Sequence, residues 1–198
     1  MARPDLTGIV LVGGASRRFG SPKALARWEG QTLAARAWQT IGEACGERLA
    51  VGKRDDGLEL PFPVLDDDTP TRAALAGIVA GLRHAPTELC VVLPVDTPLA
   101  TPGLLLELAE ACADAAVTQA GPLPAAFNRS ALPLLARRLE QGSLALRHAL
   151  AELETRVIHA DPALLANVNT REDLQALDRR TASASSSSPA PLRARPTR

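Results

Sequence analysis

Apolar residues along the chain form two kinds of run, short continuous ones and longer periodic ones. Residues 8–12 (GIVLV) and 88–96 (ELCVVLPVD) are continuous, rich in β-branched residues, and followed or interrupted by glycine or proline. Runs of this kind are typical of strands that are buried on both faces of a sheet. Shorter apolar runs at 48–51 and 62–65 predict two further strands.

The longer runs repeat their apolar residues every three or four positions, which predicts amphipathic helices. The stretch 101–113 begins with Thr101, a favoured N-cap residue, and has Pro102 at the first helical position. In the last predicted helix, Thr170 precedes Asp173 by three residues, a pattern related to the capping box. Further helices are expected at 32–45, 71–85, 131–142, 144–153 and 169–180, and further strands at 115–120 and 155–160.

The alternation of strands and helices indicates right-handed β–α–β units. Such units build an α/β fold with a doubly wound, mostly parallel sheet that helices cover on both faces. Ligands of these sheets bind beside the carboxyl ends of the strands, so we expect the loops after Val12 and Pro94 at one binding edge. We assign residues 1–180 to one domain and the Ser-, Ala-, Pro- and Arg-rich residues 181–198 to a disordered tail.

Composition narrows the classes of function. Lysine plus arginine number 22, as do aspartate plus glutamate, so the chain has no charge excess that favours nucleic acid or a membrane surface. Any anion site must therefore be local. Cys45, Cys90 and Cys112 are scattered without the spacing of a disulfide framework or a zinc site, and no run is long and apolar enough to span a bilayer. These features predict a cytoplasmic protein.

The loop 11–25 (LVGGASRRFGSPKAL) is the first candidate for chemistry. Its glycines match neither the dinucleotide fingerprint nor the P-loop, which need other spacings. Adjacent glycines still let backbone amides approach an anion, and Arg17, Arg18 and Lys23 add three cations. The alternative is a solvated basic loop, but clustered cations repel one another unless an anion lies among them. We therefore expect a polyphosphate to bind here.

Acidic residues follow two of the predicted strands. Asp96 ends the run 88–96, where it either binds a divalent cation such as Mg²⁺ or caps a turn by accepting the amide of Thr97 or Leu99. Mg²⁺ prefers one or two carboxylates together with phosphate oxygens and water. Since the anion loop is expected at the same edge, we favour the metal site.

Three aspartates, Asp66 to Asp68, follow the run 62–65. One interpretation is an acidic turn that supplies the N-cap of a helix near Thr71. That role needs only one of the three carboxylates. Another carboxylate then remains to accept two parallel donors, such as the N1–H and N2–H groups of a guanine base.

The loop 11–25 resembles the L-x-G-G-x-S-x-R-[MF]-G-x-D-K-A-L motif of nucleotidyltransferases, and most closely that of the molybdenum cofactor guanylyltransferases. The resemblance covers roughly residues 7–178. In that family the loop binds a nucleoside triphosphate, and its arginine and lysine steer the phosphates. Val12 and Pro22 stand where the family has alanine and aspartate. The resemblance implies catalytic roles for Arg18 and Lys23 and nucleotide binding by Leu11, Val12, Gly13, Gly14 and Lys23.

Further segments carry the same resemblance. The sequence around Asp96 matches the P-x-D-x-P motif that holds the family's magnesium, which implies that Asp96 binds metal and nucleotide. Asp67 aligns with an acid that contacts guanine, and residues 73–77 (AALAG) keep only the end of the family's GPLAG turn. Residues 166–174 (ANVNTREDL) resemble N-[IV]-N-T-P-E-D-L. Either one of Asn167 and Asn169 binds the metal or the substrate phosphate while the other holds the loop, or both cap the last helix.

The resemblance implies a Rossmann-like nucleotidyltransferase that uses Mg²⁺, transfers GMP from GTP to the terminal phosphate of molybdopterin, and releases pyrophosphate. The Gly13-Gly14 pair favours this guanylyl form over a cytidylyltransferase for the same cofactor. Another small-molecule nucleotidyltransferase and a non-catalytic nucleotide-binding module are the remaining alternatives. The expected protein partners are molybdenum cofactor insertion proteins or apo-molybdoenzymes, with neither nucleic acid nor a membrane involved.

Overall fold

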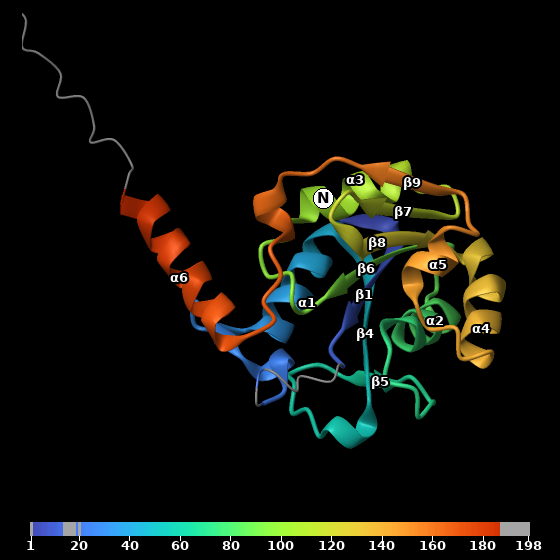
Figure 1. The fold of residues 1–198 in the computed structure, drawn as a ribbon, viewed down its shortest axis with the longest axis horizontal. Helices are drawn as coiled ribbons and strands as arrows, with labels where there is room; N and C mark the ends of the chain where they lie inside the picture. Colours follow the sequence, from blue (N-terminus) through green and yellow to red (C-terminus); the bar gives the residue numbers. More distant parts are fainter. Residues whose placement is uncertain (1, 14–18, 20, 187–198) are drawn as a thin grey trace, which may run out of the picture.

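The computed structural model describes residues 2–13, 19 and 21–186, with side chains described as far as residue 179. Within this part of the chain, seven strands form one main sheet (Figure 1). Only β8 runs antiparallel to its neighbours, so the mostly parallel sheet is confirmed. The strands, from edge to edge, are β5 (Val64–Asp66), β4 (Cys45–Gly52), β1 (Arg3–Leu11), β6 (Leu89–Pro94), β8 (Gly121–Asn128), β7 (Ala115–Thr118) and β9 (Thr155–Ile158).

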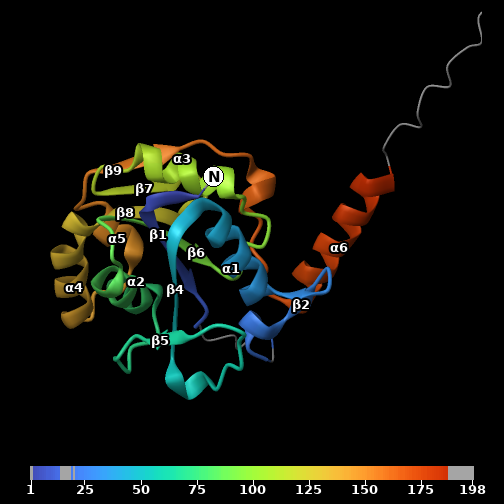
Figure 2. The same ribbon diagram turned by 180° about the vertical axis from the view of Figure 1, so that it is seen from behind.

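Helices cover both faces of this sheet (Figures 1 and 2), which confirms the doubly wound fold. The central strand β1 shows the reason, because its side chains alternate between two apolar cores. Leu6 and Val10 lie in one core, and Ile9 and Leu11 lie in the other. The first core packs against α1 (Leu33–Ala44) and α3 (Pro102–Ala111), and the second against α2 (Ala74–His84), α4 (Leu132–Glu140) and α5 (Leu146–Leu150).

Short elements complete the described part of the chain. Two-residue strands form a small antiparallel ribbon before α1, and single 3₁₀ turns stand at four connections among the described residues. These elements are β2 (Arg27–Trp28), β3 (Gln31–Thr32), η1 (Lys23–Leu25), η2 (Arg54–Asp56), η3 (Arg129–Ala131) and η4 (Pro162–Leu165).

The predicted helix caps are present. The Thr101 hydroxyl accepts the N–H of Leu104 at 3.2 Å, and Pro102 is the first residue of α3. At the last helix, α6 (Arg171–Ser186), the Thr170 hydroxyl accepts the N–H of Asp173 at 3.1 Å. The Asp173 carboxylate accepts the N–H of Thr170 at 2.8 Å in return, which completes the reciprocal capping box.

The helix α6 extends away from the rest of the molecule in both views (Figures 1 and 2). Its Leu174 and Leu177 pack against the first core, so the start of the helix is held to the domain. The helix takes in residues 181–186 of the segment expected as a tail, and residues 187–198 lie outside the described residues. The division into domain and tail stays a prediction.

The strand β8 was not expected from the sequence. Prolines at 122 and 124 interrupt its first half, and only Ala125, Ala126 and Phe127 form an unbroken apolar run. Those three residues pair with β6 on one side and with β7 on the other. The ladder to β6 begins only after the prolines. Proline lacks the N–H that a ladder needs. The strand therefore forms because its three-residue apolar run pairs with two neighbouring strands, which a local sequence pattern does not reveal.

Gly77 and Gly81 allow α2 to pack closely on β1. A Cβ at Gly81 would lie 2.7 Å from Ile9 Cδ1, and a Cβ at Gly77 would lie 2.8 Å from Leu11 Cδ2. These two helical glycines therefore lie where α2 packs closely on the strand. This approach places the first turn of α2 beside the carboxyl end of β1.

Candidate functional site

A pocket of about 460 Å³ opens at the carboxyl edge of the sheet. Cavities of this size commonly hold small-molecule ligands. The chain segments that follow β1, β4, β5 and β6 all contribute to its wall. Of the residues proposed from the sequence, the pocket wall includes Leu11, Val12, Gly13, Lys23, Asp67, Asp96 and Asn167. Gly14 and Arg18 lie outside the described residues.

Backbone hydrogen bonds continue past the strand ends and hold these segments together. The N–H of Val12 donates to Val51 O at 2.9 Å, and the N–H of Asp67 donates to Gly52 O at 3.2 Å. A Cβ on Gly13 would lie 3.3 Å from Gly52 Cα, so the two glycine backbones nearly touch. Gly13 and Lys23, described residues of the loop after Val12, therefore lie at the carboxyl edge of the sheet as expected.

Lys23 and Asp96 meet in this pocket although 73 positions separate them in the sequence. The Lys23 ammonium lies 3.2 Å from Asp96 Oδ2 and 3.1 Å from Asn169 Oδ1. The side chains of Lys23 and Asp96 are 15% and 29% exposed, so solvent only partly screens this ion pair. The N–H of Thr97 donates to Pro94 O at 3.3 Å and not to the Asp96 carboxylate. Backbone atoms therefore close this turn, and the carboxylate is directed to Lys23.

The two asparagines of 166–174 contact the same region. The Thr97 hydroxyl donates to Asn167 Oδ1 at 3.1 Å, and the intervening N–H of Val168 donates to Asp96 O at 2.8 Å. Neither asparagine side chain caps α6, because Thr170 and Asp173 provide that cap. Backbone N–H groups, first that of Asn169, lower the pKa of Asp173. The segment is therefore fastened beside Asp96.

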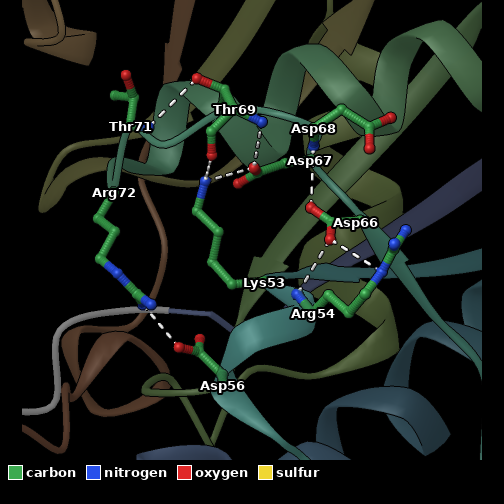
Figure 3. A network of polar contacts seen from close by, with 9 residues as sticks. All are labelled: Lys53, Arg54, Asp56, Asp66, Asp67, Asp68, Thr69, Thr71 and Arg72. Atoms are coloured by element: carbon green, nitrogen blue, oxygen red, sulfur yellow. Dashed lines mark hydrogen bonds and ion pairs between the residues drawn. The ribbon is translucent and has the colours of Figure 1, made fainter.

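The acidic turn after β5 divides its three carboxylates among different tasks (Figure 3). Asp66 accepts the N–H of Asp68 at 3.0 Å and that of Arg54 at 3.2 Å, and these bonds, the first above all, lower its pKa. Asp67 lines the pocket. The side chain of Asp68 points away from both in Figure 3.

The expected N-cap near Thr71 is wrong. Ala73 is the N-cap residue of α2, and it has no side-chain cap bond. The N–H of Thr71 donates instead to the hydroxyl of Thr69 at 3.2 Å. The acidic turn is therefore stabilised by its own bonds, and none of its carboxylates is needed to begin the helix.

Lys53 is a pocket residue that sequence reasoning missed. Its ammonium makes an ion pair with Asp67 and also donates to Thr69 O (Figure 3). The two side chains are only 11% and 6% exposed. The available signal was its place directly after β4, at the same sheet edge as Asp67. Close by, Arg72 lines the pocket and contacts Asp56 at 2.7 Å, and that hydrogen bond raises the pKa of Arg72.

The oxygen atoms beside Lys23 fit a hard cation. Among the described residues, no group of three or more His, Cys, Asp or Glu side chains could hold a metal by itself. Asp96 Oδ2 and Asn169 Oδ1 nevertheless converge on one cationic group, the Lys23 ammonium. Mg²⁺ uses few protein ligands when phosphate oxygens and water complete its shell, so this sparse oxygen pair suits it.

The segment 120–123, at the β7–β8 turn and the start of β8, forms another part of the pocket wall. None of the helices in the described part of the chain is long and apolar enough to cross a membrane.

Comparison with known proteins gives consistent similarities. Residues 8–157 match the family model described as "MobA-like NTP transferase domain". The "Probable molybdenum cofactor guanylyltransferase" of Bacillus subtilis (strain 168) is 32% identical over 192 residues, covering 87% of this chain and 94% of the relative. The "Molybdenum cofactor guanylyltransferase" of Desulfosudis oleivorans is 30% identical over 187 residues, covering 86% and 93%.

A solved structure has the same fold. The molybdopterin-guanine dinucleotide biosynthesis protein A from Archaeoglobus fulgidus superposes with a TM-score of 0.77, covering 89% of this chain and 99% of that protein. The two sequences are 24% identical, so this similarity shows the fold alone.

Proposed function

This chain belongs to the family of MobA-like NTP transferase domains, and from that premise we propose that it is a molybdenum cofactor guanylyltransferase. As a nucleotidyltransferase it moves a nucleoside monophosphate from a triphosphate to an acceptor. We propose GTP as donor, the terminal phosphate of molybdopterin as acceptor, and pyrophosphate as the second product. The observation that carries the proposal is the meeting of Lys23, Asp96 and Asn169 beside one pocket.

The nucleotide would lie along the carboxyl edge of the sheet. Leu11, Val12 and Gly13 line the pocket at the end of β1, and a Cβ on Gly13 would lie only 3.3 Å from Gly52 Cα, which favours glycine at this approach. Lys23 donates to the phosphate oxygens, and Asp67 accepts from the base. Gly14 and Arg18 would extend the phosphate contacts, a role that stays a prediction from the sequence.

For the metal we propose Mg²⁺, held by Asp96 with Asn169 beside it. When bound, this ion offsets charge on the triphosphate and stabilises the leaving pyrophosphate. The residues of the chain position the two substrates so that the acceptor phosphate lies in line with the α-phosphorus. A phosphate near neutral pH is already an anionic nucleophile, so the transfer needs positioning and charge stabilisation more than a general base.

Buried thiols support a location in a reducing compartment, and we propose the cytoplasm. The described cysteines are free, with Cys45 and Cys90 buried. Burial raises the pKa of both thiols to about 12, so they are unreactive in the folded protein. We also propose that cofactor insertion proteins or apo-molybdoenzymes receive the product.

Substrate choice tests the function directly. Pyrophosphate release is measured with the purified chain, molybdopterin and Mg²⁺, using GTP, CTP or ATP as donor. We expect release with GTP that depends on molybdopterin, and at least tenfold slower release with CTP or ATP, since each mismatched hydrogen bond to a base costs about this factor. Equal or faster turnover with CTP would make the chain a cytidylyltransferase. Nucleotide binding without turnover on any donor would make it a binding module.

A further inference from the structure

Only two of the 22 basic residues of this chain are lysines, and both line the pocket. Lys23 lies beside Asp96, whereas Lys53 lies at the other end of the edge, beside Asp67. The strand order β5–β4–β1–β6 places the segments after β5 and β4 on one side and the segment after β6 on the other. If the triphosphate lies over Lys23 and Asp96, the base lies over Lys53 and Asp67.

The described residues leave one N–H group of the Lys53 ammonium without an acceptor. An ammonium carries three donors and accepts nothing. Among the described residues its hydrogen-bond acceptors are Asp67 Oδ1 and Thr69 O, which occupy two of the three. Asp67 Oδ1 also accepts the N–H of Thr69 at 3.3 Å. These bonds to Oδ1 leave Oδ2 as the oxygen best able to accept from a ligand.

The pair thus presents a donor and an acceptor side by side in a largely buried place. Guanine carries the O6 acceptor next to the N1–H and N2–H donors, which is the matching order. Adenine and cytosine carry an amino group where guanine carries O6, so this amine would face the donor of Lys53. A carboxylate alone would accept from such an amine as readily as from guanine, and would not separate these bases.

We propose that Lys53 is a specificity-determining residue that donates to O6 of guanine while Asp67 accepts from N1–H and N2–H. This inference rests on the proposed function, in which the donor is GTP. Lysine suits the task because its compact ammonium bonds to Asp67, Thr69 and a ligand at once. A buried ion pair is weak evidence for a role in stability alone, since desolvation offsets much of its attraction. The place of both side chains in the pocket wall supports a role in binding.

Binding of base analogues to the unaltered protein gives the first test. Inosine triphosphate keeps O6 and N1–H, and 2-aminopurine riboside triphosphate keeps only the 2-amino group. We expect inosine triphosphate to bind within about tenfold of GTP, and the 2-aminopurine compound to bind as weakly as ATP, roughly 10- to 100-fold below GTP. If the 2-aminopurine compound binds as tightly as GTP, no protein group recognises O6 and the proposal is overturned.

The Lys53→Met variant gives the second test, because methionine keeps the apolar stem and removes the donors. We expect GTP and inosine triphosphate to lose affinity together by roughly 10- to 100-fold, while the affinity for ATP stays constant or rises. A purely structural lysine would instead lower the affinity for all three nucleotides equally. The Lys53→Gln variant, which retains a neutral donor, should recover part of the preference for GTP over ATP.

Arg54→Met is the matched control. Arg54 follows Lys53 directly and pairs with Asp66 at 3.4 Å, but its side chain is 81% exposed and lies outside the pocket wall. Its ratio of GTP to ATP affinity should equal that of the unaltered protein. Unaltered protein without any preference for GTP would overturn both this inference and the proposed function. A preference for GTP that survives in Lys53→Met would overturn the role of Lys53 alone.

Discussion

At the scale of single residues, the pocket is organised by two ion pairs of different exposure. Lys23–Asp96 is the more open pair and Lys53–Asp67 the more buried one. An open pair can exchange partners with a substrate or an ion at low cost, because water still reaches both charges. A buried pair keeps its geometry, because an unpaired charge there is costly. This difference suits phosphate and metal handling at Asp96 and base selection at Lys53.

Replacing Asp96 with asparagine should abolish most turnover. The substitution keeps the size of the side chain but removes the charge that pairs with Lys23 and is proposed to hold Mg²⁺. We expect the rate of GMP transfer to fall roughly 100- to 1,000-fold, the range for loss of one electrostatic contact in the transition state. The melting temperature should change little, because Asp96 is partly exposed.

Pyrophosphate release and thermal melting measure these two effects. Asp5→Asn is the matched control, since Asp5 pairs with Arg3 at 2.7 Å on the exposed part of β1, away from the pocket. Near-normal turnover in Asp96→Asn would remove Asp96 from the metal site. Loss of folding in that variant would instead give the carboxylate a structural role.

Residues in the two strong motifs could be placed from the sequence, and residues joined only in space could not. Lys23 and Asp96 each stand in a recognisable local pattern, and the fold brings them together as expected. Lys53 has no such pattern: its position after β4 is ordinary until Asp67 and Thr69, on a different segment, supply its partners. The contacts of Asn167 and Asn169 could not be predicted either, because their partners, Thr97 and Lys23, lie on distant segments of the chain.

At the scale of elements, the close contact of α2 with β1 sets the depth of the pocket. A helix without side chains at two successive turns can lie nearer to the strand than one with even a methyl group there. Gly77 also belongs to the pocket wall, so the same approach that packs the core shapes the site. Packing and binding are therefore coupled through this one helix.

Gly81→Ala should lower stability. The new methyl carbon would meet three carbons of the buried Ile9 side chain, the nearest at 2.7 Å. Overpacking of a core costs about 1–3 kcal/mol, and the better helix propensity of alanine returns up to about 1 kcal/mol. We expect a net loss of about 1–2 kcal/mol, measured as a shift of the urea midpoint.

Gly103→Ala provides the control, because the nearest atom to its new Cβ would be Thr101 Oγ1 at 3.8 Å. That change in the first turn of α3 should be neutral or stabilising. A Gly81→Ala variant as stable as Gly103→Ala would show that α2 can move away from β1 without cost.

Elements with a long apolar signature were predictable, and an element defined by its partners was not. The runs at 8–12 and 88–96 became β1 and β6, which are parallel neighbours in the middle of the sheet. The strand at 62–65 was displaced to β5 at Val64–Asp66, because Pro61 and Pro63 cannot donate to a ladder. The antiparallel β8 depends on β6 and β7, which a local pattern does not contain.

At the scale of the whole molecule, two cores on either side of one sheet bury nearly all large apolar side chains of the described residues. Val157 on the edge strand β9 is the one large apolar side chain among them that is exposed. Two buried thiols lie within these cores, Cys45 in the first and Cys90 in the second. Burial of these two thiols raises their pKa values, so the free energy of unfolding depends on pH.

Stability should fall as the pH rises above about 9. The unfolded thiols lose protons near the ordinary pKa of 9.0, whereas burial keeps the folded thiols protonated to about pH 12. The unfolded state therefore binds fewer protons in this window, and each thiol lowers the free energy of unfolding by about 1.4 kcal/mol per pH unit. Below pH 9 both states hold the protons and the effect vanishes.

Urea unfolding at pH 8, 9 and 10.5 measures this slope. Cys112, whose pKa burial raises to about 11, adds a smaller effect of the same sign. The chain has no tyrosine and only two lysines. The double variant Cys45→Ala, Cys90→Ala should show a much flatter profile. An equal slope in that variant would assign the alkaline loss of stability to other groups.

The placement of both lysines in the pocket has a consequence for covalent chemistry. Apart from an α-amino group, they are the only primary amines of the chain. Any lysine acetylation, or any reaction of a lysine with an aldehyde or acylating metabolite, therefore falls within the pocket wall. A single such event would remove either the charge beside Asp96 or the charge beside Asp67. A bound ligand would therefore shield both lysines from modification, and modification of either lysine would alter ligand binding.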